Sequence, residues 1–303
     1  MRLLRLVAAL LALAVLAGCA GATPGPAACG LRRWTVARLI ARDNLLLVPV
    51  WIDTKPSVLL LDTGAQRTIL TEAAVRRLHL RTDPLHITHT AGIGGGSSDF
   101  DVWAGSFMLG PANVPIDRLA VGHFQLRNLG DITPDGLLGS DILSQFDIDL
   151  DPRAGRMTLY RGRPCGPARP LWQGQYESLP DIGRYGDRIT VALAVNGVGT
   201  RATLDTGAQF TAVDRGFAER LGAHFATDQR IVAHGASPGQ ISVPAHRFAT
   251  LRVGTFSVRN PVLPVVSLPK GAGGALLGGD FLAGRRVWLS YPSAHVFIAT
   301  PGG

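Results

Sequence analysis

The sequence contains little that would support metal or nucleic-acid chemistry. Its three cysteines form no Cys-x-x-Cys pair and no Cys/His cluster, and no His-Glu-x-x-His segment is present, so no zinc site is predicted. No Gly-Lys-Ser/Thr follows its glycine-rich stretch, which excludes a P-loop. The basic residues are scattered and not interleaved with aromatics, which argues against a nucleic-acid-binding module.

Charge is also scarce and one-sided. Only 17% of the residues are charged, and the net charge of +8 comes almost entirely from arginine, since Lys55 and Lys270 are the only lysines. This excess reflects either a compositional bias or an affinity for an anionic surface. The 46% hydrophobic content supports real cores, and 37 glycines with 20 prolines favour an all-β chain with many turns.

No apolar run at the amino terminus is long enough for a confident membrane span. The segment Leu6 to Leu16 follows a basic start and has the length of a signal peptide. It ends in Leu-Ala-Gly before Cys19, which looks like a bacterial lipobox, so we expect Cys19 to be lipidated. The alternative is ordinary cleavage after Ala22. No Asp follows Cys19, which favours the outer membrane, on the periplasmic side of the envelope.

One hexapeptide, Leu-Asp-Thr-Gly-Ala-Gln, occurs twice. Its aspartates are Asp62 and Asp205, which lie 143 positions apart, and each copy follows a short apolar, strand-like run. A single Asp-Thr-Gly would most simply be a tight turn. Two copies in equivalent contexts suggest two carboxylates that meet, because an acidic side chain at the end of a buried strand is costly without partners.

The surroundings of the hexapeptide repeat as well. Each copy is preceded by a predicted strand, at 45–52 and 189–195, and followed by a short predicted helix, at 71–78 and 214–221. Leu-Leu-Gly-x-Asp then recurs, so that Gly139 lies 77 positions after Asp62 and Gly278 lies 73 after Asp205. The chain is therefore predicted to be a duplicated domain.

We divide the chain accordingly into five parts. These are a signal peptide at 1–18, a lipidated tether at 19–39, an N-terminal lobe at 40–160, a Pro- and Gly-rich linker at 161–186 and a C-terminal lobe at 187–300. Removal of Cys19 from the thiol pool leaves Cys29 and Cys165, an even pair in an oxidising compartment. They bracket the first repeat, and we expect them to form a disulfide.

Each half resembles a retropepsin-like aspartic protease domain, through Asp-Thr-Gly-Ala, a glycine-rich central loop and the Leu-Leu-Gly element. The resemblance implies an all-β fold of two lobes of the closed β-barrel type, with few short helices, related by a pseudo-twofold axis. The linker is long enough for both lobes to pair within one chain, so we expect a monomer.

The resemblance also assigns roles to residues. Asp62 and Asp205 are the expected catalytic pair, and Thr63 and Thr206 would bond across the axis. Gly64 and Gly207 would let the loops turn tightly. The glycine-rich loops would act as flaps over the substrate, with the flap residues Gly92, Ile93, Gly94, Gly95 and Gly235. Ala65 and Ala208 follow the retroviral pattern, and Pro238 makes the second flap less typical.

The predicted function is that of an aspartic endopeptidase, which uses a water activated by the two carboxylates on an extended polypeptide. No cofactor, metal or nucleic-acid partner is expected, and the membrane is contacted through the lipid anchor. The alternative is a binding module that holds peptide on the same fold without turnover. A serine or cysteine hydrolase is disfavoured; neither Cys29 nor Cys165 has a histidine nearby in the sequence.

Overall fold

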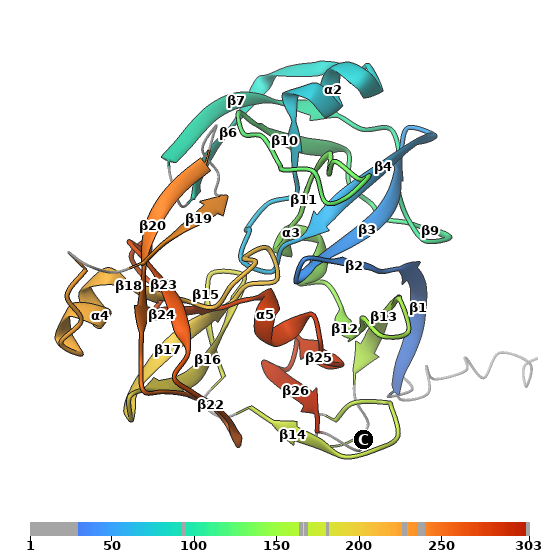
Figure 1. Cartoon of the computed structure of the whole chain (residues 1–303). Helices are drawn as coiled ribbons and strands as arrows, with labels where there is room; N and C mark the ends of the chain where they lie inside the picture. Colours follow the sequence, from blue (N-terminus) through green and yellow to red (C-terminus); the bar gives the residue numbers. More distant parts are fainter. Residues whose placement is uncertain are drawn as a thin grey trace, which may run out of the picture.

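The computed structural model describes residues 30–300 except 93–94, 164–165, 167–168, 180–181, 226–228 and 235–239. These residues form two ten-stranded sheets, one six-stranded sheet and four short helices (Figure 1). The expected all-β class with few helices is confirmed. No helix in the described part of the chain is long and apolar enough to cross a bilayer.

The first ten-stranded sheet forms the N-terminal lobe. Its strand order is β6-β7-β10-β5-β11-β4-β3-β8-β9, and β2 pairs with β3. Helix α2 (Glu72–Leu78) follows β5, and helix α3 (Ser140–Leu143) follows β11. The strands are β2 (Ile40–Arg42), β3 (Leu45–Ile52), β4 (Lys55–Leu61), β5 (Ile69–Thr71), β6 (Thr82–Gly92), β7 (Gly95–Trp103), β8 (Phe107–Leu109), β9 (Ala112–Asn113), β10 (Arg118–Gly122) and β11 (Gly136–Leu138).

The second ten-stranded sheet repeats this plan in the C-terminal lobe. Its order is β19-β20-β23-β18-β24-β17-β16-β21-β22, and β15 pairs with β16. Helices α4 (Arg215–Arg220) and α5 (Gly279–Leu282) take the places of α2 and α3. The strands are β15 (Gly183–Tyr185), β16 (Arg188–Val195), β17 (Val198–Leu204), β18 (Ala212–Asp214), β19 (Gln229–His234), β20 (Gln240–Arg247), β21 (Thr250–Val253), β22 (Phe256–Arg259), β23 (Val262–Val266) and β24 (Ala275–Leu277).

The matching strand orders confirm the duplication. Over the described residues, neither order returns to its first strand, so the strand pairing does not show the closed barrel that we expected.

Local chemistry explains the elements that recur in both lobes. The β3–β4 and β16–β17 hairpins turn at Asp53-Thr54 and Asn196-Gly197, where all four residues have positive φ, as a tight hairpin turn requires. The Thr71 side chain accepts a hydrogen bond from the Ala74 N–H and thereby caps α2. Asp214 caps α4 in the same way.

The six-stranded sheet joins the two lobes. Its order is β1-β13-β12-β25-β26-β14, and its central pair, β12 with β25, brings one strand from each lobe together. Across this pair, Arg286 makes two hydrogen bonds to the buried Asp149, at 2.9 and 2.6 Å. The strands are β1 (Gly30–Arg38), β12 (Asp147–Asp151), β13 (Arg156–Arg163), β14 (Tyr176–Ser178), β25 (Val287–Ser290) and β26 (His295–Ala299).

This sheet corrects the predicted tether and linker. Residues 30–38 of the expected tether are strand β1, which pairs with β13 along its whole length and packs Trp34 against Phe146, with ring centroids 4.8 Å apart. The expected linker at 161–186 contains the end of β13 and the strands β14 and β15. Strands β1 and β14 pair with β13 and β26, which lie far away in the sequence, so their local composition gave no sign of this pairing. Strand β15 pairs with β16, which follows it directly.

The acidic strand at 147–151 also differs from expectation. Its alternation of apolar and acidic residues predicted a half-buried strand. In the structure, Asp147 and Asp149 are buried as well, because the partner lobe covers that face and supplies Arg286 and Ser290 as partners.

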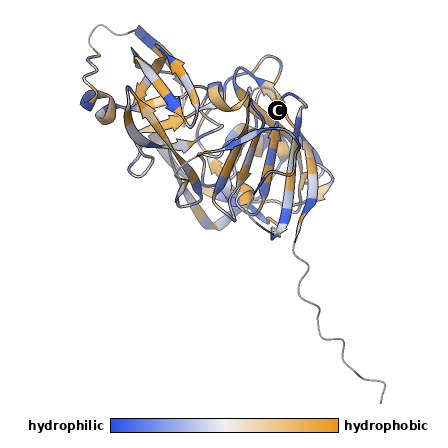
Figure 2. Cartoon of the chain, turned by 90° about the horizontal axis from the view of Figure 1, so that it is seen from below, coloured by the Kyte–Doolittle hydropathy of each residue, from blue (hydrophilic) through white to orange (hydrophobic). Residues whose placement is uncertain are grey.

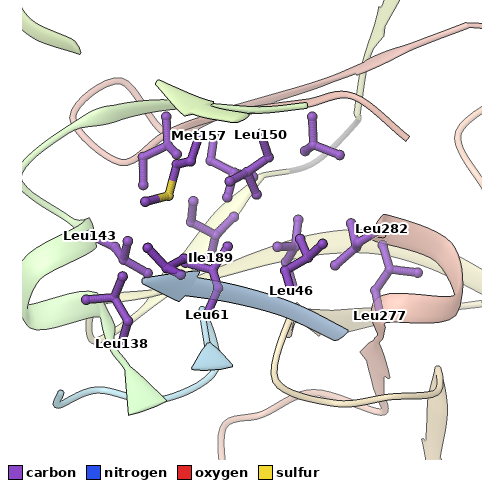
Figure 3. Close-up of a cluster of buried hydrophobic side chains, with 14 of the residues drawn as sticks. Leu46, Leu61, Leu138, Leu143, Leu150, Met157, Ile189, Leu277 and Leu282 are labelled. Carbon is purple, nitrogen blue, oxygen red and sulfur yellow. The ribbon is translucent and has the colours of Figure 1, made fainter. Parts of the chain in front are cut away.

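One continuous core lies beneath both lobes. Figure 3 shows side chains from the two halves in a single cluster, with Leu46, Leu61 and Leu138 of the first lobe beside Ile189, Leu277 and Leu282 of the second. Strands coloured by hydropathy alternate between apolar and polar residues (Figure 2), as expected for sheets with one face toward a core. The lobes therefore share a core, and this shared core fixes the position of one lobe relative to the other.

Candidate active site

Each Asp-Thr-Gly loop is placed by a parallel strand. Strand β11 lies between β4 and β5, and strand β24 lies between β17 and β18. The Asp62 N–H donates to the Leu138 carbonyl at 3.0 Å, and the Asp205 N–H donates to the Leu277 carbonyl at 3.0 Å. In each lobe, the repeated Leu-Leu-Gly element therefore fixes the position of the aspartate at the end of the neighbouring strand.

Each aspartate is held by its own loop. One carboxylate oxygen of Asp62, Oδ1, accepts the N–H groups of Gly64 and Ala65, both at 2.9 Å. Oδ1 of Asp205 accepts the N–H groups of Gly207 and Ala208, both at 3.0 Å. These bonds fix the orientation of both carboxyl groups, which in turn hydrogen-bond each other.

The two threonines lock the loops together. The Thr63 hydroxyl donates to the Leu204 carbonyl at 2.7 Å and accepts from the Thr206 N–H at 3.1 Å. The Thr206 hydroxyl makes the reciprocal pair of bonds, to the Leu61 carbonyl and from the Thr63 N–H. Both threonines are fully buried. The structure therefore places Thr63 and Thr206 across the lobe interface, where we expected them.

The loop glycines leave room for the opposite carboxylate. A Cβ atom on Gly64 would lie 2.6 Å from the Asp205 Cγ atom, and one on Gly207 would lie 2.4 Å from the Asp62 Cγ atom. Ordinary van der Waals contact begins at 3.4 Å. Close approach of the two loops therefore requires glycine at both positions, in addition to the tight turn that we predicted.

The electrostatics favour a dyad with one proton. Burial, followed by the negative charge of Asp205, raises the pKa of Asp62 well above its usual value. Burial also raises the pKa of Asp205, but its loop N–H groups, the bond from Asp62 and the positive charge of Arg188 oppose this. Both pKa values are raised, so the pair retains a proton to higher pH than an isolated carboxyl group would, and the positive charge of Arg188 favours the ionised form of Asp205.

Arg188 is a site residue that the sequence did not reveal. Its Nε–H donates to the Gly64 carbonyl of the other lobe at 2.7 Å. The corresponding first residue of β3 is the buried Leu45, so this cation is present on one side only. Comparison of the two repeats could have singled out this difference, but an arginine at the start of a strand does not by itself indicate a site.

A second layer braces each loop. The Thr68 hydroxyl donates to Asp141 at 2.7 Å and accepts from the Gly139 N–H at 3.1 Å. In the second lobe, the Thr211 hydroxyl makes the same bonds with Asp280 and Gly278. The repeat of Leu-Leu-Gly-x-Asp hinted at this role for the aspartates. The threonines carried no such hint.

The predicted flap loops are hairpins. The first flap is the hairpin β6–β7, in which Gly92 pairs with Gly95. The second flap is the hairpin β19–β20. Figure 1 shows both hairpins on the same side of the molecule, one from each lobe. Ile93, Gly94 and Gly235 lie outside the described residues, as do Cys19, Cys29 and Cys165.

One segment bears on the serine hydrolase that we disfavoured from the sequence. Gly235 to Gly239 reads Gly-Ala-Ser-Pro-Gly and so matches the Gly-x-Ser-x-Gly pattern of serine hydrolases. These residues lie outside the described part, but their flanks are two antiparallel strands of a hairpin. The pattern requires a strand-to-helix turn, so its context here does not fit a serine nucleophile.

Comparisons with known proteins agree with this geometry. Residues 48–142 match the aspartyl protease family, and residues 191–284 match the gag-polyprotein putative aspartyl protease family. A search of curated proteins found no match.

Among solved structures, the chain is similar to the aspartic proteinase from Irpex lacteus, with a TM-score of 0.52 and 12% identity. The match covers 89% of this chain and 97% of that one, and at this identity it supports the fold alone. The chain therefore contains two retropepsin-like aspartyl protease domains in tandem.

Proposed function

We propose that the chain is an aspartic endopeptidase with a single active site, formed by Asp62 of one lobe and Asp205 of the other. The observation that carries this proposal is the reciprocal geometry of the two loops. Each carboxyl group is held by two N–H groups of its own loop and packs against the glycine of the other loop.

The chemistry follows from one shared proton. The ionised carboxylate, favoured at Asp205, accepts a proton from a water while the oxygen of that water attacks the peptide carbonyl carbon. Asp62 donates its proton to the carbonyl oxygen, which yields a neutral tetrahedral diol. A proton then returns from a diol hydroxyl to the dyad and another passes to the leaving nitrogen as the C–N bond breaks. The dyad ends with one proton, as it began.

The alternative is a peptide-binding protein on the same fold. The dyad favours catalysis, because a binder has no evident need for two carboxyl groups whose burial opposes ionisation. An extended polypeptide between the flaps and the dyad is the proposed ligand in either case.

The two functions separate in one assay. We expect the purified chain to cleave an unfolded protein at acidic pH, and a statine-type transition-state analogue to block the cleavage. The double variant Asp62→Asn/Asp205→Asn should form no new peptide ends by mass spectrometry. A wild-type chain that binds the statine peptide but cleaves nothing between about pH 3 and 8 would instead support the binding module.

We also propose that the enzyme is anchored in the bacterial envelope through a lipid on Cys19, on the periplasmic side. The lipobox-like sequence before Cys19 supports this. Metabolic labelling with a fatty-acid analogue should mark the wild-type chain but not Cys19→Ser. Equal labelling of both would contradict the anchor, and separation of the membranes would test the expected outer-membrane location.

A further inference from the structure

Three ionisable side chains meet where the first flap leaves the body of its lobe. His123 follows strand β10, Glu72 begins helix α2, and Asp99 lies on the flap strand β7. The His123 Nδ1 atom lies 2.9 Å from a Glu72 carboxylate oxygen, and its Nε2 atom lies 3.0 Å from one of Asp99. A single imidazole ring therefore bridges the helix and the flap.

The geometry selects one protonation state of the ring. A neutral imidazole has one N–H donor and one bare nitrogen, which would face a carboxylate oxygen without a proton between them. The imidazolium has two N–H donors and satisfies both carboxylates with charge-assisted hydrogen bonds. The bridge is thus complete only when His123 is charged.

The bridge contacts a part of β7 with which β10 does not pair. The pairing of β10 with β7 covers only Arg118 with Trp103 and Leu119 with Val102. Nearer the flap tip, the His123 N–H donates to the Ser97 hydroxyl at 3.3 Å. The backbone and the ring of His123 together extend the hold on β7 toward the tip.

The nearby charged groups in the described part of the chain make pairs that do not join the flap to helix α2. Arg76 of α2 lies 4.0 Å from the second carboxylate oxygen of Glu72, and Arg67 lies 3.5 Å from Asp101 of β7. On β6, His89 contacts the Ser98 hydroxyl at 2.6 Å. Among the described residues, His123 is therefore the side chain that joins the flap to α2.

The described part of the second lobe has no counterpart of this bridge. Helix α4 begins with Arg215 where α2 begins with Glu72, and Ser267 follows β23 where His123 follows β10. Within the described residues, this is also the only group of three or more acidic or imidazole side chains close enough to share an ion.

We propose that His123 is a positioning residue that fastens the first flap to helix α2 when the pH falls. Histidine is the side chain that normally gains its charge between about pH 8 and 5. Its protonation would order the flap as the medium becomes acidic, the condition under which the carboxyl dyad also retains its proton. The benefit for catalysis rests on the proposed peptidase, whereas the fastening itself does not.

Hydrogen–deuterium exchange tests the fastening without any need for activity. After correction for intrinsic exchange, peptides covering 95–103 should exchange about five- to tenfold more slowly at pH 5 than at pH 8, as expected for two partly exposed charge pairs. His123→Gln, which cannot become charged, should lose this pH dependence, and Asp99→Asn should weaken it. His89→Gln, on the same hairpin, should keep it and serves as the matched control.

Two outcomes would overturn the proposal. One is flap exchange in His123→Gln that changes with pH as in the wild type. The other is protection at pH 8 that appears on addition of Zn²⁺ and disappears with a chelator, since the three side chains would then be metal ligands. An inactive protein with pH-dependent flap exchange would leave the fastening intact and count only against the peptidase.

Discussion

The contact between each loop glycine and the opposite carboxylate predicts a large effect from one methyl group. A Cβ atom at position 64 would lie 2.6 to 2.8 Å from all three atoms of the Asp205 carboxylate, against at least 3.4 Å in ordinary contact. The Asp205 carboxylate or its loop must therefore move by about 0.6 to 0.8 Å. A displacement near 1 Å at a reacting group costs about 100-fold in rate. We expect Gly64→Ala to lose activity by that factor and about 1–3 kcal/mol of stability.

The same reasoning applies to Gly207→Ala, whose Cβ atom would lie 2.4 to 2.7 Å from the Asp62 carboxylate. Gly199→Ala is the matched control, because strand β17 carries it on the way to Asp205 and nothing lies within 4 Å of its Cβ position. Peptidase kinetics and thermal unfolding of the three variants provide the assay. Activity in Gly64→Ala and Gly207→Ala within about threefold of the Gly199→Ala value would refute the steric argument.

Three further predictions concern Arg188, the pairing of the two lobes and the two cysteines beside the first repeat. Arg188→Leu removes the charge that lowers the pKa of Asp205, so the acidic limb of the pH–activity profile should move to higher pH, whereas Arg259→Leu on the exposed strand β22 should leave it in place. Activity per molecule should not depend on protein concentration, and the chain should sediment as a monomer; activity that follows a monomer–dimer equilibrium would contradict pairing of the lobes within one chain. Non-reducing peptide mapping should find Cys29 joined to Cys165, since β1 and β13 pair Gly30 with Arg163; two free thiols would exclude the bridge, whose loss should cost about 2–5 kcal/mol.

The sequence predicted the parts of this fold that depend on local chemistry. The short helices at 71–78 and 214–221 and the duplicated Asp-Thr-Gly loops all follow from residues within a few positions of one another. Since the two copies are so alike, they also predicted the meeting of Asp62 with Asp205.

Pairings between distant segments were not predictable in this way. The segment of β1 has the composition of a tether, and only its pairing with the distant β13 makes it a strand. Asp149 is buried only because Arg286 of the other lobe pairs with it. The role of Arg188 depends on its contact with the Gly64 carbonyl, and the role of His123 depends on two carboxylates that lie on other elements. These contacts depend on which surfaces the fold brings together.

The central claim is that Asp62 and Asp205 act as one unit. Its most direct test is the peptidase activity of Asp62→Asn, Asp205→Asn and the double variant, with Asp131→Asn at an exposed site as the control. If the two groups share one proton and one water, each single variant should be about as inactive as the double variant, while Asp131→Asn retains full activity and all four remain folded. More than about a tenth of wild-type turnover in either single variant would contradict the account.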